Sequence, residues 1–305
     1  IDYKRVLSEV STVLLGLNLQ PEKVEEILDE IVERSGLLLQ IDGGSKYQFA
    51  HLTLQEYFAA AELIDKSDSL VNRFQADPDV WRETIKLWCG LASDSTSVIR
   101  EVYKKDQITA FECLADAQKV DQLLAQTIID NFKVQLGNLP DKAPAVEAAF
   151  AAVAASERPR GKAVLEFLVQ TLATSQEPSR RAAAANALSL TNLPTAAQFL
   201  AHCYDNCPET RSALIRMGDL AVPALAPNAA NGSIKAMDDL VTIGTPDAAK
   251  ALAPLLWHQD KTIATEAAPR LAALMNKPGM EDVLRDYELK YKERKVDWIW
   301  QSFNK

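Results

Sequence analysis

The hydrophobic pattern at the start of the chain has the period of an amphipathic helix. Apolar residues recur every three or four positions over residues 2–17 and again over residues 21–35, which predicts two helices. Pro21 occupies an early position of the second helix, and Gly36 follows its last residue, as is common at helix starts and ends. The chain is therefore expected to open with a pair of helices.

The next segment changes to the pattern of short strands. Residues 37–41 and 46–50 predict two strands, and Asp42-Gly43-Gly44-Ser45 between them is a strong turn sequence. Helices followed by a two-stranded hairpin are typical of a winged helix. We therefore assign residues 1–65 to a winged-helix domain.

A histidine stands at the expected junction between the second strand and a third helix. Tyr47, Phe49 and His51 alternate with polar or small residues, as in a strand. Thr53 and Glu56, three residues apart, predict a capping box that opens the helix. That helix is expected to place four apolar side chains on one face: Leu54, Tyr57, Phe58 and Ala61.

Residues 66–143 continue the helical pattern without strand signals. Helices are expected over residues 80–92, 96–105, 108–117 and 120–136. The sequence Asn138-Leu139-Pro140-Asp141 then breaks the pattern. We expect this part of the chain to be a helical connector.

From residue 144 the chain becomes rich in alanine and repeats itself. Leu188, Leu214 and Leu240 lie 26 residues apart, and Leu271 follows 31 residues later. Glycine or proline separates successive helices at three junctions: residues 193–196, 218–223 and 244–248. Periods of this length are typical of stacked helical pairs. We assign residues 144–305 to a repeat array, with residues 287–305 as its C-terminal cap.

The composition narrows the class of protein. With 305 residues and 48% hydrophobic content, the chain can bury a substantial core. The net charge of −9 is concentrated in residues 1–70, which hold 6 Lys and Arg against 13 Asp and Glu, so we do not expect nucleic acid to bind there.

The same composition bears on location. No apolar run approaches the ~18 residues that span a bilayer, and the four cysteines are too sparse for a disulfide framework. We expect a cytoplasmic protein without membrane contact. Ile1 begins inside a helical pattern, from which we expect a piece of a longer polypeptide.

Around His51 the chain carries a specific pattern of Phe-x-His, a polar residue, Gln-Glu-Tyr-Phe and Ala-Ala. It is formed by Phe49, His51, Thr53, Gln55, Glu56, Tyr57, Phe58, Ala59 and Ala60. This pattern resembles the end of the winged-helix domain of NACHT-type signal-transduction NTPases, regulatory ATPases that include animal inflammasome receptors and bacterial immune proteins. Residues 33–38 and Tyr47 also look like this family. The resemblance covers roughly residues 1–65.

The resemblance implies a role for His51. In NACHT proteins the histidine of this motif contacts the β-phosphate of bound ADP and stabilises the resting state, and an imidazole N–H can donate to phosphate. Without the resemblance, His51 would be interpreted as a strand-end histidine bonded to backbone. The remaining motif residues are expected to be structural, with a capping pair and aromatic core residues: Phe49, Thr53, Gln55, Glu56, Tyr57 and Phe58.

Sequence signals for catalysis are absent. A nucleotide hydrolase needs a Gly-x4-Gly-Lys-Ser/Thr loop, which none of the 11 glycines satisfies, and Gly43-Gly44-Ser45-Lys46 lacks the required order. No histidine lies near a Gly-x-Ser-x-Gly elbow. We therefore expect no catalytic residue and no cofactor in this chain. The resemblance implies ATP or ADP, with Mg, on an NTPase domain that the chain lacks.

Two other clusters of residues could be binding sites, but each also has a structural interpretation. His202-Cys203-x3-Cys207 places two thiols one helical turn apart, but zinc needs four ligands and among the other histidines only His258 could contribute, so buried thiols and no metal site are expected. The basic residues of 290–295 near Trp298 and Trp300 could hold nucleic acid, but interspersed acidic residues favour a solvated terminal helix.

The repeats resemble HEAT-like repeats of the short, bilin-lyase-associated type, so the expected fold is mainly α, with a winged helix, a helical connector and a HEAT-like α-solenoid. Together the resemblances imply the regulatory, ligand-sensing half of a NACHT-family NTPase, for example in bacterial immune signalling. Its expected partners are its own NACHT domain and a protein or other ligand on the repeats, with oligomers only in the active full-length state. A free-standing HEAT-like scaffold and a bilin-lyase-like enzyme subunit are the alternatives.

Overall fold

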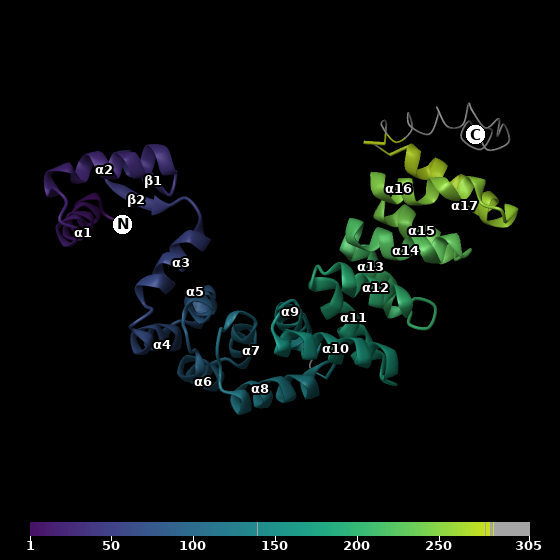
Figure 1. Cartoon of the computed structure of the whole chain (residues 1–305), viewed down its shortest axis with the longest axis horizontal. Coiled ribbons are helices and arrows are strands. Elements are labelled where there is room, and N and C mark those ends of the chain that lie inside the picture. The colour runs from purple at the N-terminus through teal and green to yellow at the C-terminus, as the bar shows by residue number, and fades with distance from the viewer. Residues whose placement is uncertain (139, 278, 281–282, 284–305) are drawn as a thin grey trace. The chain divides into compact units, whose positions relative to one another are not determined.

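The computed structural model describes residues 1–138, 140–277, 279–280 and 283 (Figure 1). These residues are mainly α-helical, and the sheet among them is a single antiparallel hairpin, which confirms the expected mainly α fold. Contacts divide the chain into two compact units, residues 1–124 and 125–305. The three-part division expected from the sequence stays a prediction. None of the described helices is long and apolar enough to cross a bilayer.

The N-terminal elements follow the order expected of a winged helix. Their bounds are α1 (Tyr3–Gly16), a 3₁₀ turn (Pro21–Lys23), α2 (Val24–Glu30), a π-helical turn (Ile31–Ser35), β1 (Leu38–Ile41) and β2 (Lys46–Phe49). Gly36 ends the second helical segment in the left-handed region, with a φ of 62°. The hairpin turn also uses left-handed glycines, Gly43 and Gly44. The glycine positions therefore fix the boundaries that the sequence predicted.

A small core joins the helices to the hairpin. Val6 of α1, Leu28 of α2 and Tyr47 of β2 are buried together. The rings of Tyr3 and Tyr47 stack with their centroids 6.0 Å apart. Two backbone bonds add to this: the Tyr47 amide donates to the Ile1 carbonyl at 2.8 Å and the Tyr3 amide to the Ser45 carbonyl at 3.0 Å. These contacts fix α1 against the wing.

Further helices complete the first unit. They are α3 (Leu52–Glu62), α4 (Ser67–Ala76), α5 (Pro78–Leu91), α6 (Thr96–Lys105) and α7 (Gln107–Asp116), and α8 (Gln122–Gln135) follows. Of these helices, α4 was not predicted from the sequence. α3 packs on α5, where the Trp88 indole N–H donates to the Leu63 carbonyl at 3.0 Å. Trp88 is only 3% exposed, so this hydrogen bond is buried at the C-terminal end of α3.

The second unit is a succession of helices in two layers. The elements after α8 are a 3₁₀ turn (Pro140–Lys142), α9 (Ala143–Ala154), α10 (Pro159–Thr174), α11 (Pro178–Leu190), α12 (Pro194–His202), α13 (Glu209–Met217), a 3₁₀ turn (Gly218–Ala221), α14 (Val222–Ala230), α15 (Ile234–Ile243), α16 (Pro246–Leu252), a 3₁₀ turn (Ala253–Trp257) and α17 (Lys261–Met275). α9, α11, α13, α15 and α17 pack successively on one another, and α12, α14 and α16 form the second layer.

The repeated leucines occupy equivalent places in the first layer. Leu188, Leu214, Leu240 and Leu271 lie on α11, α13, α15 and α17, and none is more than 1% exposed. The junction residues also behave as expected, since Pro194 and Pro246 begin α12 and α16. The likeness to HEAT repeats stays a prediction. The predicted cap at residues 287–305 and the basic run 290–295 lie outside the described residues.

Candidate functional site

The candidate site is the junction where β2 passes into α3. Phe49 pairs with Leu38 across the hairpin, and the Ala50 amide donates to the Leu37 carbonyl at 2.9 Å. His51 then adopts extended backbone angles, φ −130° and ψ 132°, and is the N-cap residue of α3. Its carbonyl accepts the first helical hydrogen bonds from the amides of Leu54 and Gln55. The histidine is therefore fixed through its backbone, at the end of a helix.

The expected capping box is wrong. The helix begins at Leu52, so Thr53 lies inside its first turn and cannot be the cap, and no side chain makes a capping hydrogen bond at this end. The extended conformation of His51 ends the strand and starts the helix two residues earlier than the Thr53–Glu56 spacing indicated. Glu56 is instead half-buried on the helix, where burial raises its pKa, with a smaller contribution from Glu83.

The imidazole of His51 is exposed at the start of α3. Among the described residues, no hydrogen bond joins this imidazole to the protein. The alternative interpretation, a strand-end histidine whose ring is bonded to backbone, is therefore wrong for the described residues. Thr53 and Gln55 are exposed beside it. A role of this exposed ring in nucleotide contact stays a prediction.

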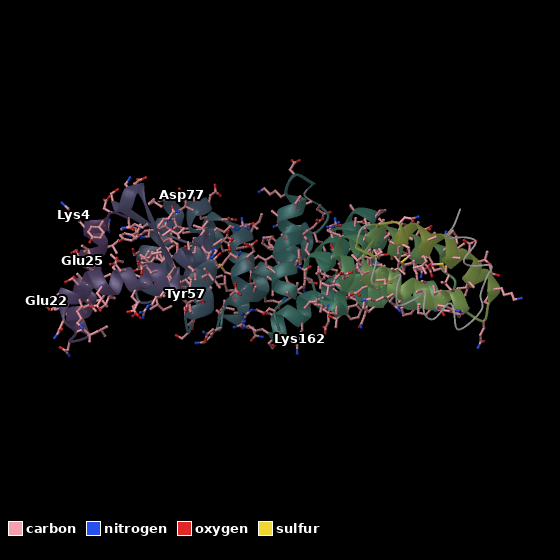
Figure 2. All side chains as sticks on the ribbon, turned by 90° about the horizontal axis from the view of Figure 1, so that it is seen from above. Lys4, Glu22, Glu25, Tyr57, Asp77 and Lys162 are labelled. Carbon is pink, nitrogen blue, oxygen red and sulfur yellow. The ribbon has the colours of Figure 1, made fainter. Side chains whose placement is uncertain are left out.

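The motif aromatics form a surface cluster. Phe49 and Phe58 stack with centroids 5.8 Å apart, and the Tyr57 ring packs edge-on against Phe58 at 5.7 Å. Tyr57 is 42% exposed and Phe58 43% exposed, so the expectation that they lie in the core is wrong for the described chain. Ala60 is the buried residue of α3, and Figure 2 labels Tyr57 on this helix.

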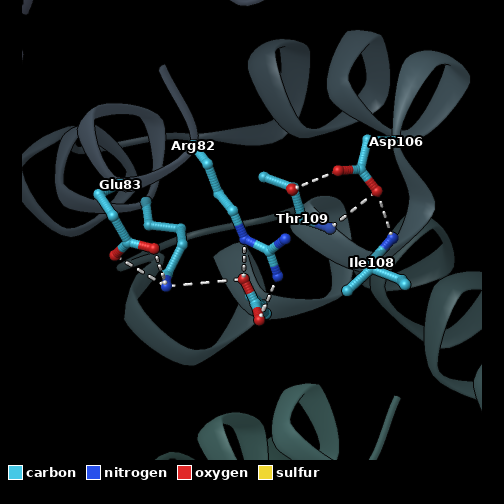
Figure 3. Close-up of polar contacts among 7 residues, drawn as sticks. Arg82, Glu83, Asp106, Ile108 and Thr109 are labelled. Carbon is cyan, nitrogen blue, oxygen red and sulfur yellow. Dashed lines mark hydrogen bonds and ion pairs between the residues drawn. The ribbon is translucent and has the colours of Figure 1, made fainter. Parts of the chain in front are cut away.

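A partly buried ion cluster joins α5, the helix on which α3 packs, to α7 (Figure 3). Glu112 of α7, whose side chain is 8% exposed, accepts from Nε and Nη2 of Arg82 at 3.1 and 2.7 Å. The Lys86 ammonium lies 3.5 Å from the same carboxylate. The hydrogen bond to Glu112 raises the pKa of Arg82. These charges satisfy one another and fasten α5 to α7, which is a structural role.

The cysteine cluster of the second unit is separate from this junction. Cys207 is buried and its thiol lies 3.6 Å from the Leu172 carbonyl, while burial raises the pKa of the half-buried Cys203. His202 is exposed at the end of α12. Within the described ranges, no three His, Cys, Asp or Glu side chains are grouped as a metal site would need.

Comparison with known proteins identifies the first part of the chain. Residues 18–63 match the family model described as a winged helix-turn-helix domain C-terminal to NACHT. The matched segment contains the hairpin, His51 and all of α3. Residues 18–63 thus form a winged helix of the kind that lies C-terminal to NACHT. No curated protein and no solved structure matches the chain.

Two supporting features were not predicted from the sequence. Glu112 stands alone in the apolar run Ala110–Leu114, and an acidic residue there indicates a buried carboxylate that needs a cation. That signal predicts a partner without naming it, because Arg82 lies 30 residues away. The Trp88 bond to the Leu63 carbonyl has no sequence signal, since it depends on how two helices pack.

Proposed function

We propose that this chain is the regulatory half of a NACHT-type NTPase and favours its ADP-bound resting state until a partner binds the helical repeats. The observation that carries the proposal is the match of residues 18–63 to a winged helix that lies C-terminal to NACHT. That description supports a nucleotide-binding domain ahead of this segment in the full-length protein. The acidic N-terminal part of the chain also supports a protein partner over nucleic acid.

In this proposal His51 contacts the nucleotide. Its ring is exposed and without a hydrogen bond among the described residues, while its backbone is fixed between β2 and α3. A ring N–H donates to the β-phosphate of ADP, and a protonated ring does so more strongly. The contact joins the winged helix to the nucleotide domain and closes the resting state.

The helical layers of the second unit serve as the sensing surface. A partner releases the resting state only if it binds the open form more tightly than the closed form, because a ligand with equal affinity for both shifts nothing. Nucleotide exchange and assembly then follow in the full-length protein. We place this signalling in the cytoplasm, where the free cysteines are kept reduced, with bacterial immune defence as one setting.

The chain itself is proposed to have no enzymatic activity, with ATP or ADP and Mg bound by the preceding domain. Isothermal titration of residues 1–305 with MgATP and with MgADP tests this. We expect no binding heat, because the sequence has no phosphate loop. A micromolar dissociation constant for either nucleotide would contradict the proposal that only the preceding domain binds nucleotide.

A free-standing helical scaffold remains a second candidate, supported by the two-layered packing of the second unit. It gives no reason for the winged helix at residues 18–63. Reading the encoded sequence before residue 1 separates the two proposals. A phosphate-binding loop in that sequence supports the NACHT proposal, and its absence supports the scaffold.

A further inference from the structure

A groove lies between α10 and α12, the first helix of the second layer. α12 packs on α14 and α14 on α16, whereas α10 and α12, both fully described, make no comparable contact. A groove of about 580 Å³ separates them. Leu165, Val169 and Ala173 line it from α10 at four-residue intervals, and Phe199 lines it from α12.

Beside this groove α10 packs on α9 and α11 and not on α12. Gly161 has no side chain to prevent this approach, and a Cβ there would lie only 2.1 Å from the Ser156 carbonyl oxygen. Phe167 of α10 also stacks on Phe150 of α9, with centroids 6.0 Å apart. The buried face of α10 is thereby used against α9 and α11. The face that carries Leu165 and Val169 is left uncovered.

The surface of the groove combines apolar area with unpaired charge. Phe199 is 41% exposed, and Leu165 and Val169 are half-buried. Lys162 and Glu166, one helical turn apart, are exposed on its rim, and Figure 2 labels Lys162. In the described part of the chain neither of these two charges forms an ion pair. A ligand in the groove can therefore meet both an apolar stripe and two charges of opposite sign.

We propose that this groove binds an amphipathic helix of a protein partner. The lined part of α10, from Lys162 to Thr174, is about 18 Å long, which accommodates roughly three turns of helix. Apolar residues at intervals of four are the complement of a helix with the same spacing, as in other helix-in-groove complexes. The bound helix carries an acidic residue opposite Lys162 and a basic residue opposite Glu166. A purely apolar small ligand leaves both charges without a partner.

Fluorescence anisotropy of a labelled helical peptide tests the proposal with the chain of residues 1–305. The probe is a three-turn peptide with leucines at intervals of three and four and a Glu and a Lys one turn apart, made in both charge orders because a helix can lie in either direction. Saturable binding of one order is expected. Val169→Glu is expected to weaken it at least about tenfold, since a charge would face apolar surface.

Val134→Glu is the matched control, because Val134 is a 67% exposed valine on α8 outside the groove. It is expected to leave the affinity unchanged, and circular dichroism establishes that both variants are folded. Lys162→Glu is expected to weaken the preferred peptide several-fold, and a peptide with Lys in place of its Glu is expected to regain the loss. No saturable binding, equal loss in both valine variants, or binding of a fluorescent fatty acid in place of either peptide would overturn the proposal.

The inference deepens the proposed function and rests on it for its regulatory meaning, since it names the kind of partner that the repeats would sense. The peptide assay does not involve nucleotide or His51. A negative peptide assay would therefore not contradict the proposed contact between His51 and nucleotide. A negative test of that contact would not contradict peptide binding in the groove.

Discussion

Arg211→Met is expected to destabilise the second unit more than Asp239→Asn, although the two side chains belong to one ion pair. The Asp239 carboxylate is 1% exposed and accepts from Nε and Nη2 of Arg211 at 3.1 and 2.5 Å. It also accepts from the Tyr204 hydroxyl at 2.5 Å. The Arg211 side chain is 40% exposed. The pair thus joins α13 to α15 with one partner in the core and the other at the surface.

The two substitutions leave different groups behind. Arg211→Met leaves a buried carboxylate with only the Tyr204 hydroxyl, and breaking a buried pair in this way costs about 3–5 kcal/mol. Because water already screens the partly exposed guanidinium, we expect about 3 kcal/mol. Asp239→Asn keeps an acceptor for Tyr204 and leaves Arg211 free to face water, so its expected cost is about 1–2 kcal/mol.

Urea denaturation followed by far-ultraviolet circular dichroism measures the loss of unfolding free energy in each variant. Arg216→Met is the matched control, because Arg216 is an exposed arginine on the same helix that bonds the neutral Asn186 side chain at 2.9 Å. It is expected to cost under about 1 kcal/mol. The reasoning is refuted if Arg211→Met costs no more than this control, or less than Asp239→Asn.

Three further substitutions test local features of the fold. Gly161→Ala is expected to lower the unfolding free energy by about 1–3 kcal/mol, because its Cβ would lie 2.1 Å from the Ser156 carbonyl oxygen, whereas Gly16→Ala, with nothing within 4 Å, is expected to raise it by roughly 0.5 kcal/mol. Thermal melts that show equal shifts would contradict this. Burial raises the pKa of Glu147, so its carboxyl group binds a proton more tightly in the folded state than in the unfolded chain. The charged carboxylate therefore destabilises the folded state, and this cost falls as the pH is lowered through the raised pKa toward the ordinary value of 4.5. Glu147→Gln, which keeps an acceptor for Asn186, is therefore expected to stabilise by under about 1 kcal/mol near neutral pH, with a gain that shrinks on acidification; a pH-independent gain would argue against this cause.

The winged helix could be predicted from the sequence because its signals are local. Gly36 and the Gly43-Gly44 turn take left-handed angles that other residues rarely adopt, so they fix the ends of helix and strands directly. The spacing of Leu188, Leu214 and Leu240 likewise indicates burial on equivalent helices without knowledge of their neighbours. In both cases the residue type itself determines the local structure.

The details of the site depend on contacts between elements, and there the sequence misleads. Thr53 and Glu56 have capping-box spacing, yet the hairpin delivers His51 in extended conformation and makes it the cap. Tyr57 and Phe58 have the chemistry of core residues, yet α3 packs on α5 through another face and leaves them at the surface. Helix orientation after a strand is set by tertiary packing, which a hydrophobic pattern does not specify.

The groove between α10 and α12 shows the same limit. The spacing of Leu165, Val169 and Ala173 is that of an ordinary buried stripe, because nothing in the sequence says that α10 packs on α9 and α11 rather than on α12. Gly161 approaches the carbonyl oxygens of Val153 and Ser156 closely, and a helical glycine alone does not reveal which groups it approaches. Exposed apolar stripes of this kind become visible only once the neighbouring helices are placed.

Release of ADP from the full-length protein tests the central claim most directly. The dissociation rate of a fluorescent ADP analogue is measured for the native protein, for His51→Ala and for His202→Ala, whose histidine is exposed at the end of α12. A hydrogen bond to a charged phosphate contributes about 1.5–3 kcal/mol, so His51→Ala is expected to speed ADP release by roughly tenfold or more. His202→Ala is expected to match the native rate. Native ADP release from His51→Ala would contradict the proposed contact between this histidine and the nucleotide.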